Sequence, residues 1–334
     1  MGFKKSMLKS PRFFGIVGMS LKALEVRDLV KYYDGFKALD GLSFDVGDGE
    51  IHGFLGPNGA GKTTTIRVLM GLLDSDGGEI RIYGESEDGR DFRTMSRIGY
   101  MPEMPSFPGH LTSEELLDIY GQIFCVSEEE RVERAEELLG LVGLSNYADE
   151  RIETFSKGMR QRLGIAQSLI SDPDLLVLDE PTAGLDPGGR ARIRNIVQDV
   201  GDRGITIFIS SHLLEEVEKT CDHATIIHEG QCVMSGSVEE ISNFHKGSEL
   251  DMEIHGLDDD VVDAVELLSQ VERVEREGEE LRVFVRGVED ARIQVSKAIT
   301  EAGGTIIGMS RRSRSLEEVF LEVTEGGSKD GQLR

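Results

Sequence analysis

The sequence has 334 residues, about the length of two average domains, and its apolar content of 39% is enough for hydrophobic cores. Its formal net charge is −25 at pH 7, and the acidic residues are spread along the chain. We therefore expect no nucleic-acid partner, because binding to phosphates depends on basic side chains. The acidic excess is typical of a solvated surface, and adaptation to a salty cytoplasm is an alternative explanation.

The chain's thiols and termini bear on its location. Cys125, Cys221 and Cys232 form no CxxC pair and leave an odd thiol, which favours a reducing, intracellular compartment. No apolar run approaches the roughly 20 residues of a spanning helix, so another subunit is expected to supply any membrane part. Residues 1–20 are expected to be a tail. They faintly resemble a signal peptide with too short an apolar core, and Met19 is an alternative start.

The first two thirds of the chain, residues 21–242, predict an α/β domain. Short apolar runs bounded by Gly and Asp indicate strands, and the last two of them are apolar throughout, as in a parallel sheet covered on both faces. Helical spacing follows over 63–73, and the acidic helical pattern over 112–144 predicts an inserted helical subdomain at about 103–165. The predicted strands are 24–30, 43–46, 50–55, 175–178 and 205–209.

The remaining residues, 243–334, predict a small α+β domain and tail. The alternating patterns give the order βαββαβ, which is that of a ferredoxin-like unit. A last helix is expected over 316–323, with Ser315 and Glu318 forming a capping box. The other predicted elements are strands at 250–255, 271–275, 281–285 and 305–310, and helices at 261–268 and 291–301.

A glycine-rich loop joins the predicted strand 50–55 to the helix 63–73, which is where a P-loop must lie. Its glycines let backbone amides surround phosphate oxygens, Lys62 can reach the β and γ phosphates, and Thr63 can hold Mg²⁺. A chance glycine loop is the alternative. The expected nucleotide-binding residues here are Gly56, Pro57, Asn58, Gly59, Ala60, Gly61, Lys62, Thr63 and Thr64.

Two carboxylates, Asp179 and Glu180, follow the buried strand 175–178. Ligands bind at the carboxyl ends of strands in open α/β sheets. Asp179 suits Mg²⁺ and Glu180 suits the attacking water, although alone this pair would equally suit the capping of a loop. With the P-loop upstream, the pair predicts a phosphoryl-transfer site.

At this point the chain resembles an ABC ATPase over about 21–238, because further short motifs follow in that family's order. Ser156 and Gly158 match its Leu-Ser-Gly-Gly-Gln signature, whereas Phe155, Lys157 and Met159 depart from it. The resemblance implies that the serine and the backbone amides face a γ-phosphate. An ordinary Ser-capped helix is the alternative interpretation.

The resemblance also implies roles for four further residues. Asp186 falls in the family's D-loop and would communicate across a dimer, and His212 stands at the switch histidine and would contact the γ-phosphate. Tyr33, or Tyr32 if the register differs by one, would stack on adenine. Glu103 stands where most members have the Q-loop glutamine, and it would bear on Mg²⁺ and water. The alternatives are a turn aspartate, a helix-start histidine and a core tyrosine.

By resemblance, the chain is an ATPase subunit that binds ATP and Mg²⁺, with Lys62, Glu103, Glu180 and His212 as catalytic residues. Glu103, the signature and the segment 315–320 resemble the subfamily that drives ABC-2 type exporters. The implied partners are an integral-membrane permease and a second ATPase subunit, identical or not. The implied location is the inner face of the cell membrane. The alternatives are an importer subunit, an ABC ATPase acting on ribosomes or DNA, and a regulatory module that holds ATP without turnover.

One further cluster resembles a metal-ligand set, comprising Cys221, His223, His228 and Cys232. Side chains alternate between the two faces of a strand, so residues five apart point to opposite faces. We therefore expect no metal there, and we expect the C-terminal domain to serve dimerisation or regulation, or simply to stabilise the chain.

Overall fold

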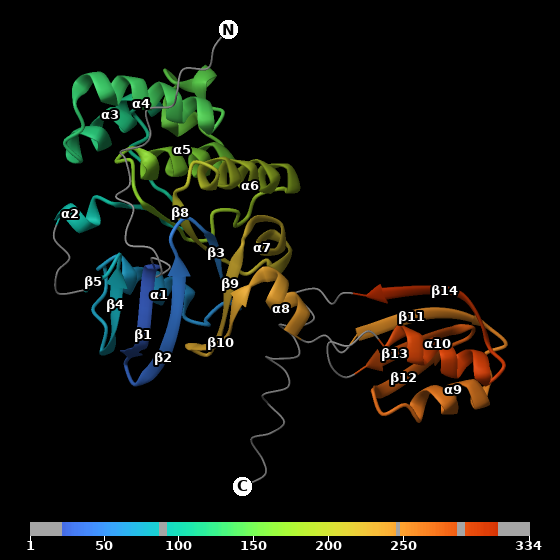
Figure 1. Ribbon diagram of the computed structural model, residues 1–334. Helices are drawn as coiled ribbons and strands as arrows, with labels where there is room; N and C mark the ends of the chain where they lie inside the picture. Colours follow the sequence, from blue (N-terminus) through green and yellow to red (C-terminus); the bar gives the residue numbers. More distant parts are fainter. Residues whose placement is uncertain (1–21, 87–91, 245–247, 286–290, 313–334) are drawn as a thin grey trace, which may run out of the picture. The chain divides into compact units, whose positions relative to one another are not determined.

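The computed structural model describes residues 22–86, 92–244, 248–285 and 291–312 (Figure 1). Two compact units make up the chain, Met1–Gly236 and Ser237–Arg334. The expected tail at 1–20 and the expected helix at 316–323, with its capping box, lie outside the described residues.

A six-stranded sheet forms the centre of the first unit, in the order β10-β9-β3-β8-β7-β6. Strand β3 pairs in parallel with β8 and β9, and β7 pairs in parallel with β6 and β8. All four residues of β7 are buried, as expected for a strand covered on both faces. The strands are β3 (Ile51–Leu55), β6 (Ile98–Met101), β7 (Leu175–Leu178), β8 (Thr206–Ser211), β9 (His223–His228) and β10 (Gln231–Ser237).

A second sheet of the first unit is antiparallel, in the order β2-β1-β4-β5. One face contributes Leu24, Val26 and Phe44 to a core that also contains Phe54 and Phe208 of the central sheet. The strands β1 and β2 are longer than the sequence predicts. The four strands are β1 (Lys22–Tyr33), β2 (Phe36–Gly47), β4 (Gly77–Ile82) and β5 (Glu85–Ser86).

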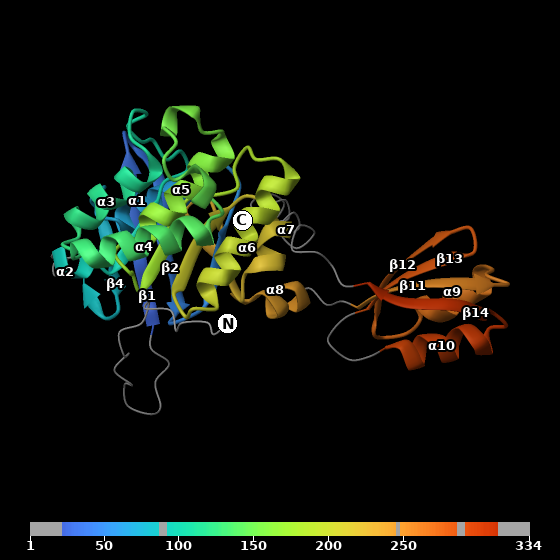
Figure 2. The same cartoon turned by 90° about the horizontal axis from the view of Figure 1, so that it is seen from above.

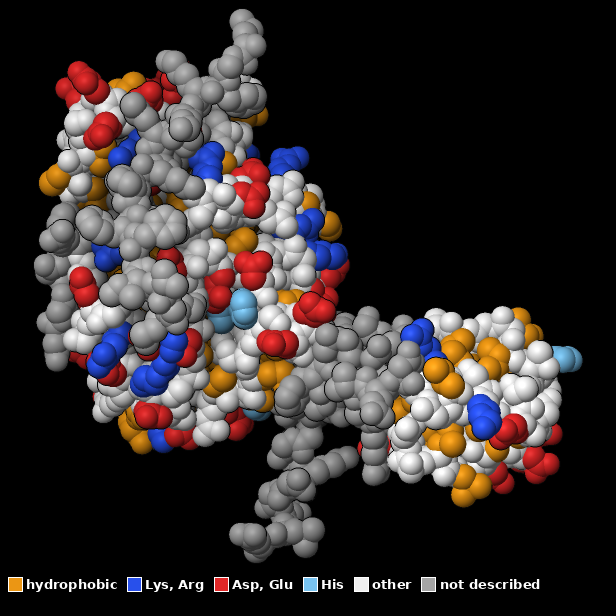
Figure 3. Space-filling model, in the orientation of Figure 1, with side chains coloured by type: hydrophobic (Ala, Val, Ile, Leu, Met, Phe, Trp, Pro, Cys, Tyr) orange, Lys and Arg blue, Asp and Glu red, His pale blue; other side chains and the backbone are white. Residues whose placement is uncertain are grey.

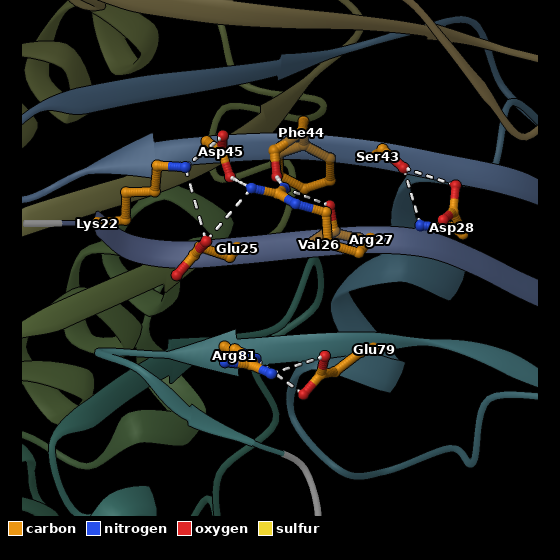
Figure 4. A network of polar contacts seen from close by, with 10 residues as sticks. All are labelled: Lys22, Glu25, Val26, Arg27, Asp28, Ser43, Phe44, Asp45, Glu79 and Arg81. Carbon is orange, nitrogen blue, oxygen red and sulfur yellow. Dashed lines mark hydrogen bonds and ion pairs between the residues drawn. The ribbon is translucent and has the colours of Figure 1, made fainter.

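Charged side chains link β1 to β2 across this second sheet (Figure 4). Asp45 on β2 accepts from Lys22 at 2.9 Å and pairs with Arg27 at 2.5 Å, and both cations also pair with Glu25. Partial burial alone would raise the pKa of Asp45, but the hydrogen bonds from Lys22 and Arg27 hold it below its usual range. These ion pairs join the two strands at the end of the hairpin that lies away from its turn, which follows Tyr33.

The expected helical subdomain contains α3 (Ser113–Ile123) and α4 (Glu128–Leu141) rather than one continuous pattern. Cys125 takes a φ of +58°, which ends the first helix, and Ser127 then caps the second. Thr112 and Glu115 form a capping box at the start of α3. Short 3₁₀ turns at Ser145–Tyr147 and Ile152–Thr154 lead from this pair of helices to α5.

Three of the other helices of the first unit follow strands of the central sheet, since α1 follows β3, α6 follows β7 and α7 follows β8. The predicted helix 63–73 ends earlier, at Leu69, because Gly71 with a φ of +65° continues the chain in a left-handed turn. The other helices of this unit are α1 (Lys62–Leu69), α2 (Phe92–Met95), α5 (Lys157–Leu169), α6 (Pro187–Gly201) and α7 (Leu214–Thr220).

The second unit has its own core and its own antiparallel sheet, in the order β12-β13-β11-β14. Helices α9 and α10 lie on one face of that sheet (Figures 1 and 2), where their buried valines and isoleucines pack against it. After α8 (Val238–Phe244) the elements follow the predicted βαββαβ order. They are β11 (Ser248–His255), α9 (Asp259–Glu266), β12 (Val271–Glu277), β13 (Glu280–Val285), α10 (Arg292–Glu301) and β14 (Thr305–Arg312).

Candidate functional site

The glycine-rich loop runs from the end of β3 into α1, and its geometry depends on glycine. Gly61 is the N-cap of α1 with a φ of +108°, and a Cβ there would lie 2.9 Å from the carbonyl oxygen of Ala38. Lys62 is buried, and its Nζ donates to the carbonyl oxygens of Gly56 at 2.7 Å and Pro57 at 3.3 Å. The loop is therefore already curled around a lysine ammonium at a helix N-terminus, which suits an anion.

Glu180 lies opposite this loop, directly after β7, and both of its carboxylate oxygens have partners. Oε1 is 3.2 Å from Nζ of Lys62, and Oε2 accepts from Nδ1 of His212 at 2.7 Å. The backbone of Glu180 has a φ of +47°, a conformation that costs energy for a residue with a Cβ. The fold therefore holds this carboxylate in a strained position between a lysine and a histidine.

Asp179 lies deeper, with 2% of its surface exposed. Ser210 at the end of β8 donates to Oδ1 of Asp179 at 2.7 Å, and the same hydroxyl accepts from the backbone N–H of Glu180 at 2.8 Å. Burial raises the pKa of Asp179, the Ser210 bond opposes that rise, and the charges of Glu180 and Glu103 add to it. Sequence reasoning assigned no role to Ser210. The sequence feature that could have identified Ser210 is its position near the end of β8, a strand that is buried throughout and pairs with β7.

A hollow of about 380 Å³ brings the loop, Glu180 and His212 together with two aromatic side chains. Tyr33 is 40% exposed in it, so the interpretation as a core tyrosine is wrong, and Tyr32 does not line it. Phe36 is 66% exposed and pairs with Tyr33 across the turn between β1 and β2. Sequence reasoning missed Phe36, although an aromatic directly after an Asp-Gly turn was a usable signal. The lining residues are Tyr33, Phe36, Ala38, Pro57, Asn58, Gly59, Gly61, Lys62, Thr63, Thr64, Glu103, Glu180, Ala183 and His212.

Two residues of the loop, Gly56 and Ala60, are buried and do not line this hollow. Glu103 does line it, on the segment after β6. Its carbonyl oxygen accepts from Nε2 of Gln161 on α5 at 2.9 Å, and Gln161 is buried. The segment that holds Glu103 is therefore tied to α5.

The signature residues lie elsewhere. Ser156 caps α5 by accepting from the N–H of Met159, and Asp186 caps α6 by accepting from the N–H of Gly189. Both also line a second hollow of about 300 Å³ together with Gly158. The structure thus brings Ser156, Gly158 and Asp186 to one another but not to the pocket of Lys62. The remaining lining residues are Lys157, Met159, Arg162, Gly184, Leu185, Gly189 and Arg192.

The second hollow is basic. Figure 3 shows Lys and Arg side chains gathered over the region of α5 and α6. Lys157, Arg162 and Arg192 line the hollow, and within the described residues none of them forms an ion pair with an acidic side chain. Burial lowers the pKa of Arg162, and the positive charge of Arg192 lowers it further. An anion would relieve this repulsion.

The residues expected to hold Mg²⁺ can be tested by their donor chemistry. Thr63 and Glu103 line the first hollow, and the charges of Glu103 and Glu180 both act on Asp179. Asp179 itself is buried and does not line the hollow, and only Glu180 of the three carboxylates pairs with Lys62. The site therefore has excess negative charge and oxygen donors, which fit a hard divalent cation. Protein ligands for Mg²⁺ are usually completed by substrate phosphates and water.

Of the cluster of Cys221, His223, His228 and Cys232, one member has an acidic partner in the structure. Nδ1 of His223 lies 3.1 Å from Oε2 of Glu50. Within the described residues, no group of three or more His, Cys, Asp or Glu side chains is placed to hold a metal ion. Nor does the described part of the chain include a helix long and apolar enough to cross a membrane.

Comparisons with known proteins agree on one family. Its sequence profile, that of the ABC transporter, matches residues 39–183. The bacitracin transport ATP-binding protein BcrA of Bacillus licheniformis is 37% identical over 91% of this chain and 98% of its own length. The Nod factor export ATP-binding protein I of Ralstonia nicotianae is 36% identical over 93% of this chain and 96% of its own length. A solved ATP-binding cassette of an ABC transporter in its ADP conformation matches with a TM-score of 0.60 and 31% identity, over 66% of this chain and 92% of that one.

Proposed function

The chain belongs to the ABC transporter family as one of its ATP-binding proteins, and we propose that it hydrolyses MgATP to drive an ABC-2 type exporter. The observation that carries this proposal is the meeting of the P-loop, Lys62, Glu180 and His212 in one hollow. These are the groups that phosphoryl transfer to water requires. A module that holds ATP without turnover would not need a carboxylate kept in a strained backbone conformation beside the phosphate site.

In this proposal the phosphates take the place that the loop carbonyls and Glu180 now fill around Lys62. The ammonium and the loop amides stabilise the negative charge that develops as the γ-phosphoryl group leaves. Glu180, released from Lys62, orients the attacking water and accepts its proton. His212 donates from Nδ1 to Glu180, which fixes its ring so that the other nitrogen, when protonated, can donate to a phosphate oxygen.

The adenine is proposed to stack against Tyr33, with Phe36 as a second platform across the hairpin turn. Thr63, Asp179 and Glu103 are proposed to hold Mg²⁺, which would neutralise phosphate charge when bound. The buried bond from Ser210 to Asp179 keeps that carboxylate facing the site.

The second hollow supports a head-to-tail pair of ATPase subunits. Ser156, Gly158 and the three cations offer an anion site, and none of the three cations forms an ion pair within the described residues, whereas the first hollow presents the phosphates. A second subunit, identical or not, would place its signature hollow over the nucleotide of the first. Asp186, which lines the signature hollow, would then lie at the interface.

A membrane permease of the ABC-2 type is the proposed partner, and the inner face of the cell membrane is the proposed location. The support is that the relatives named for bacitracin transport and Nod factor export match more than nine-tenths of this chain, a stretch that includes the second unit.

The test is affinity purification of the tagged full chain carrying Glu180→Gln from detergent-solubilised membranes of its native host. ATP is present throughout, and mass spectrometry identifies the copurifying proteins. A multi-span permease without an external binding protein supports the proposal. Recovery of ribosomes or DNA-bound proteins would overturn it in favour of an ATPase acting outside membranes, and a permease that needs a binding protein would indicate an importer.

A further inference from the structure

The second unit has a sheet face that its own helices do not cover. Along β11, Met252 and Ile254 point into the core beneath α9 and α10, so the alternating residues Asp251 and Glu253 point to the opposite face. A hollow of about 770 Å³ lies on that opposite face, between β12 and β14. It is larger than either hollow of the first unit, and the ATPase mechanism makes no use of it.

One row of residues across this face consists almost entirely of glutamates. Glu277 on β12 pairs with Glu280 on β13, which pairs with Glu253 on β11, and Glu253 pairs with Gly308 on β14. All three glutamates are exposed and line the hollow. Like charges directly opposite each other on neighbouring strands destabilise a sheet. The row is therefore unfavourable for the unit by itself.

The next row shows that the face can balance its charges. There Glu275, Arg282 and Asp251 alternate in sign across the same three strands. Arg282 donates to Asp251 at 2.9 Å and lies 3.7 Å from Glu275. Arg276, the other cation of the hollow, is paired with Asp259 at 2.9 Å. Among the described residues, Glu253, Glu277 and Glu280 have no cation in an ion pair with them.

The row is accessible from the β14 edge of the sheet, because Gly308 has no side chain to cover it. This glycine closes the glutamate row at the β14 edge, and the atoms nearest to a Cβ built there are those of Glu253, at 3.9 Å. Cationic side chains of a partner can therefore approach the three carboxylates, which lie on three neighbouring strands. Phosphate-bearing partners are excluded by charge.

We propose that this face docks a Lys- and Arg-rich cytosolic segment of the membrane partner, an inference that rests on the proposed function. Cytosolic segments of membrane proteins carry an excess of Lys and Arg, so their charge is complementary to the unbalanced row. A second copy of this chain fits less well, because it would bring the same glutamates to the interface. The unit thus keeps an unfavourable row of charges because a cationic segment neutralises it.

The experiment uses the full chain in the Glu180→Gln background, with the purification from membranes described above. The test variant is Glu253→Gln/Glu277→Gln/Glu280→Gln, and the matched control is Glu266→Gln/Glu272→Gln, which changes exposed glutamates of the same unit outside the hollow. We expect recovery of the permease to fall about fivefold or more in the test variant and to stay unchanged in the control, since each exposed ion pair contributes modestly. As the salt concentration is raised, recovery of the permease by the chain with the unmodified face should also fall more steeply than recovery by the test variant.

Thermal unfolding of each full chain separates a docking role from a structural one. Removing the repulsion should leave the unfolding temperature of the test variant unchanged or higher, so reduced recovery cannot be ascribed to misfolding. Equal recovery of permease by the test variant and the unmodified chain would overturn the inference while leaving the proposed function in place. So would an equal loss in the control, or a change in self-association of the test variant in size-exclusion chromatography, which would assign the face to a second copy. Failure of the unmodified chain to recover any permease would instead count against the proposed function.

Discussion

The two hollows of the first unit differ in charge and in completeness. The hollow around Lys62 is lined by a lysine, a histidine and two acidic residues, Glu103 and Glu180, whose charges act on the buried Asp179, together with aromatic side chains for a base. The hollow around Ser156 contains three cations and one acid, Asp186. The first hollow has the groups of a catalytic site that binds a metal and phosphates. The second has groups that can bind an anion but no catalytic base.

This difference indicates how the reaction is controlled. Within one chain, nucleotide binding needs only the first hollow, since the loop amides and Lys62 are already in place. In the proposed head-to-tail pair, the second hollow acts on a nucleotide bound by the other subunit. Binding should therefore belong to the first hollow alone, whereas turnover should need both. The following variants test that division.

The largest effect is expected for Glu180→Gln in the first hollow. Removing the base should lower the rate of phosphate release about 10³-fold while ATP still binds, because a positioned general base contributes on the order of 10²- to 10⁴-fold. Steady-state phosphate release and equilibrium binding of a fluorescent ATP analogue measure the two properties. Glu215→Gln, which changes an exposed glutamate on α7, is the control. Turnover within tenfold of the unmodified chain would contradict the role given to Glu180.

Ser156→Ala tests the second hollow. We expect phosphate release to fall about 30-fold and ATP binding by the single chain to stay unchanged, because only a hydrogen bond to charged phosphate is lost. Ser127→Ala is a matched control, since Ser127 caps α4 as Ser156 caps α5 but lies outside the hollow. If both variants lose activity equally, Ser156 is only a helix cap. If Ser156→Ala weakens ATP binding by the single chain, the division between the hollows fails.

A smaller effect is expected for Ser210→Ala, which loosens both carboxylates of the first hollow. Losing the bonds to Asp179 and the N–H of Glu180 should lower turnover about tenfold. The Ser210 bond holds the pKa of Asp179 down against burial, so its loss raises that pKa and moves the acid limb of the activity profile to higher pH. Ser296→Ala on α10 serves as the control. An unshifted pH profile would contradict the assignment of the acid limb to Asp179.

The features of the fold and of the site that could be predicted from the sequence are those formed by residues close together in the chain. The P-loop and the carboxylates after β7 follow from residues next to one another, so their placement in one site was predictable. The capping roles of Ser156 and Asp186 are equally local. The break between α3 and α4 was missed because it depends on the backbone of Cys125, which no pattern of apolar residues records.

Contacts between distant segments were harder to foresee. Ser210 is 31 residues from Asp179, and only the pairing of β7 with β8 brings their ends together. Phe36 was missed because an exposed aromatic is unusual in a strand, and its value depends on Tyr33 across the turn. The concentration of cations in the second hollow depends on residues of α5 and α6 lining the same place, which cannot be derived from either helix alone.

The smallest effect is expected for Lys157→Met, which tests whether charge alone distinguishes the second hollow. Lys157 is exposed, and its Nζ lies close to Gly184, 2.4 Å from where a Cβ of that residue would be. In the Glu180→Gln background, ATP-dependent association of two chains should need about threefold more ATP, since one exposed cation contributes modestly. Its salt dependence should also become shallower, while Lys157→Arg behaves like the unmodified chain. Sedimentation velocity across ATP and salt concentrations measures both, with Lys219→Met as the control for an exposed lysine on α7. An unchanged ATP requirement would mean that the hydroxyl and amides around Ser156 suffice, and the contrast in charge between the hollows would then have no part in assembly.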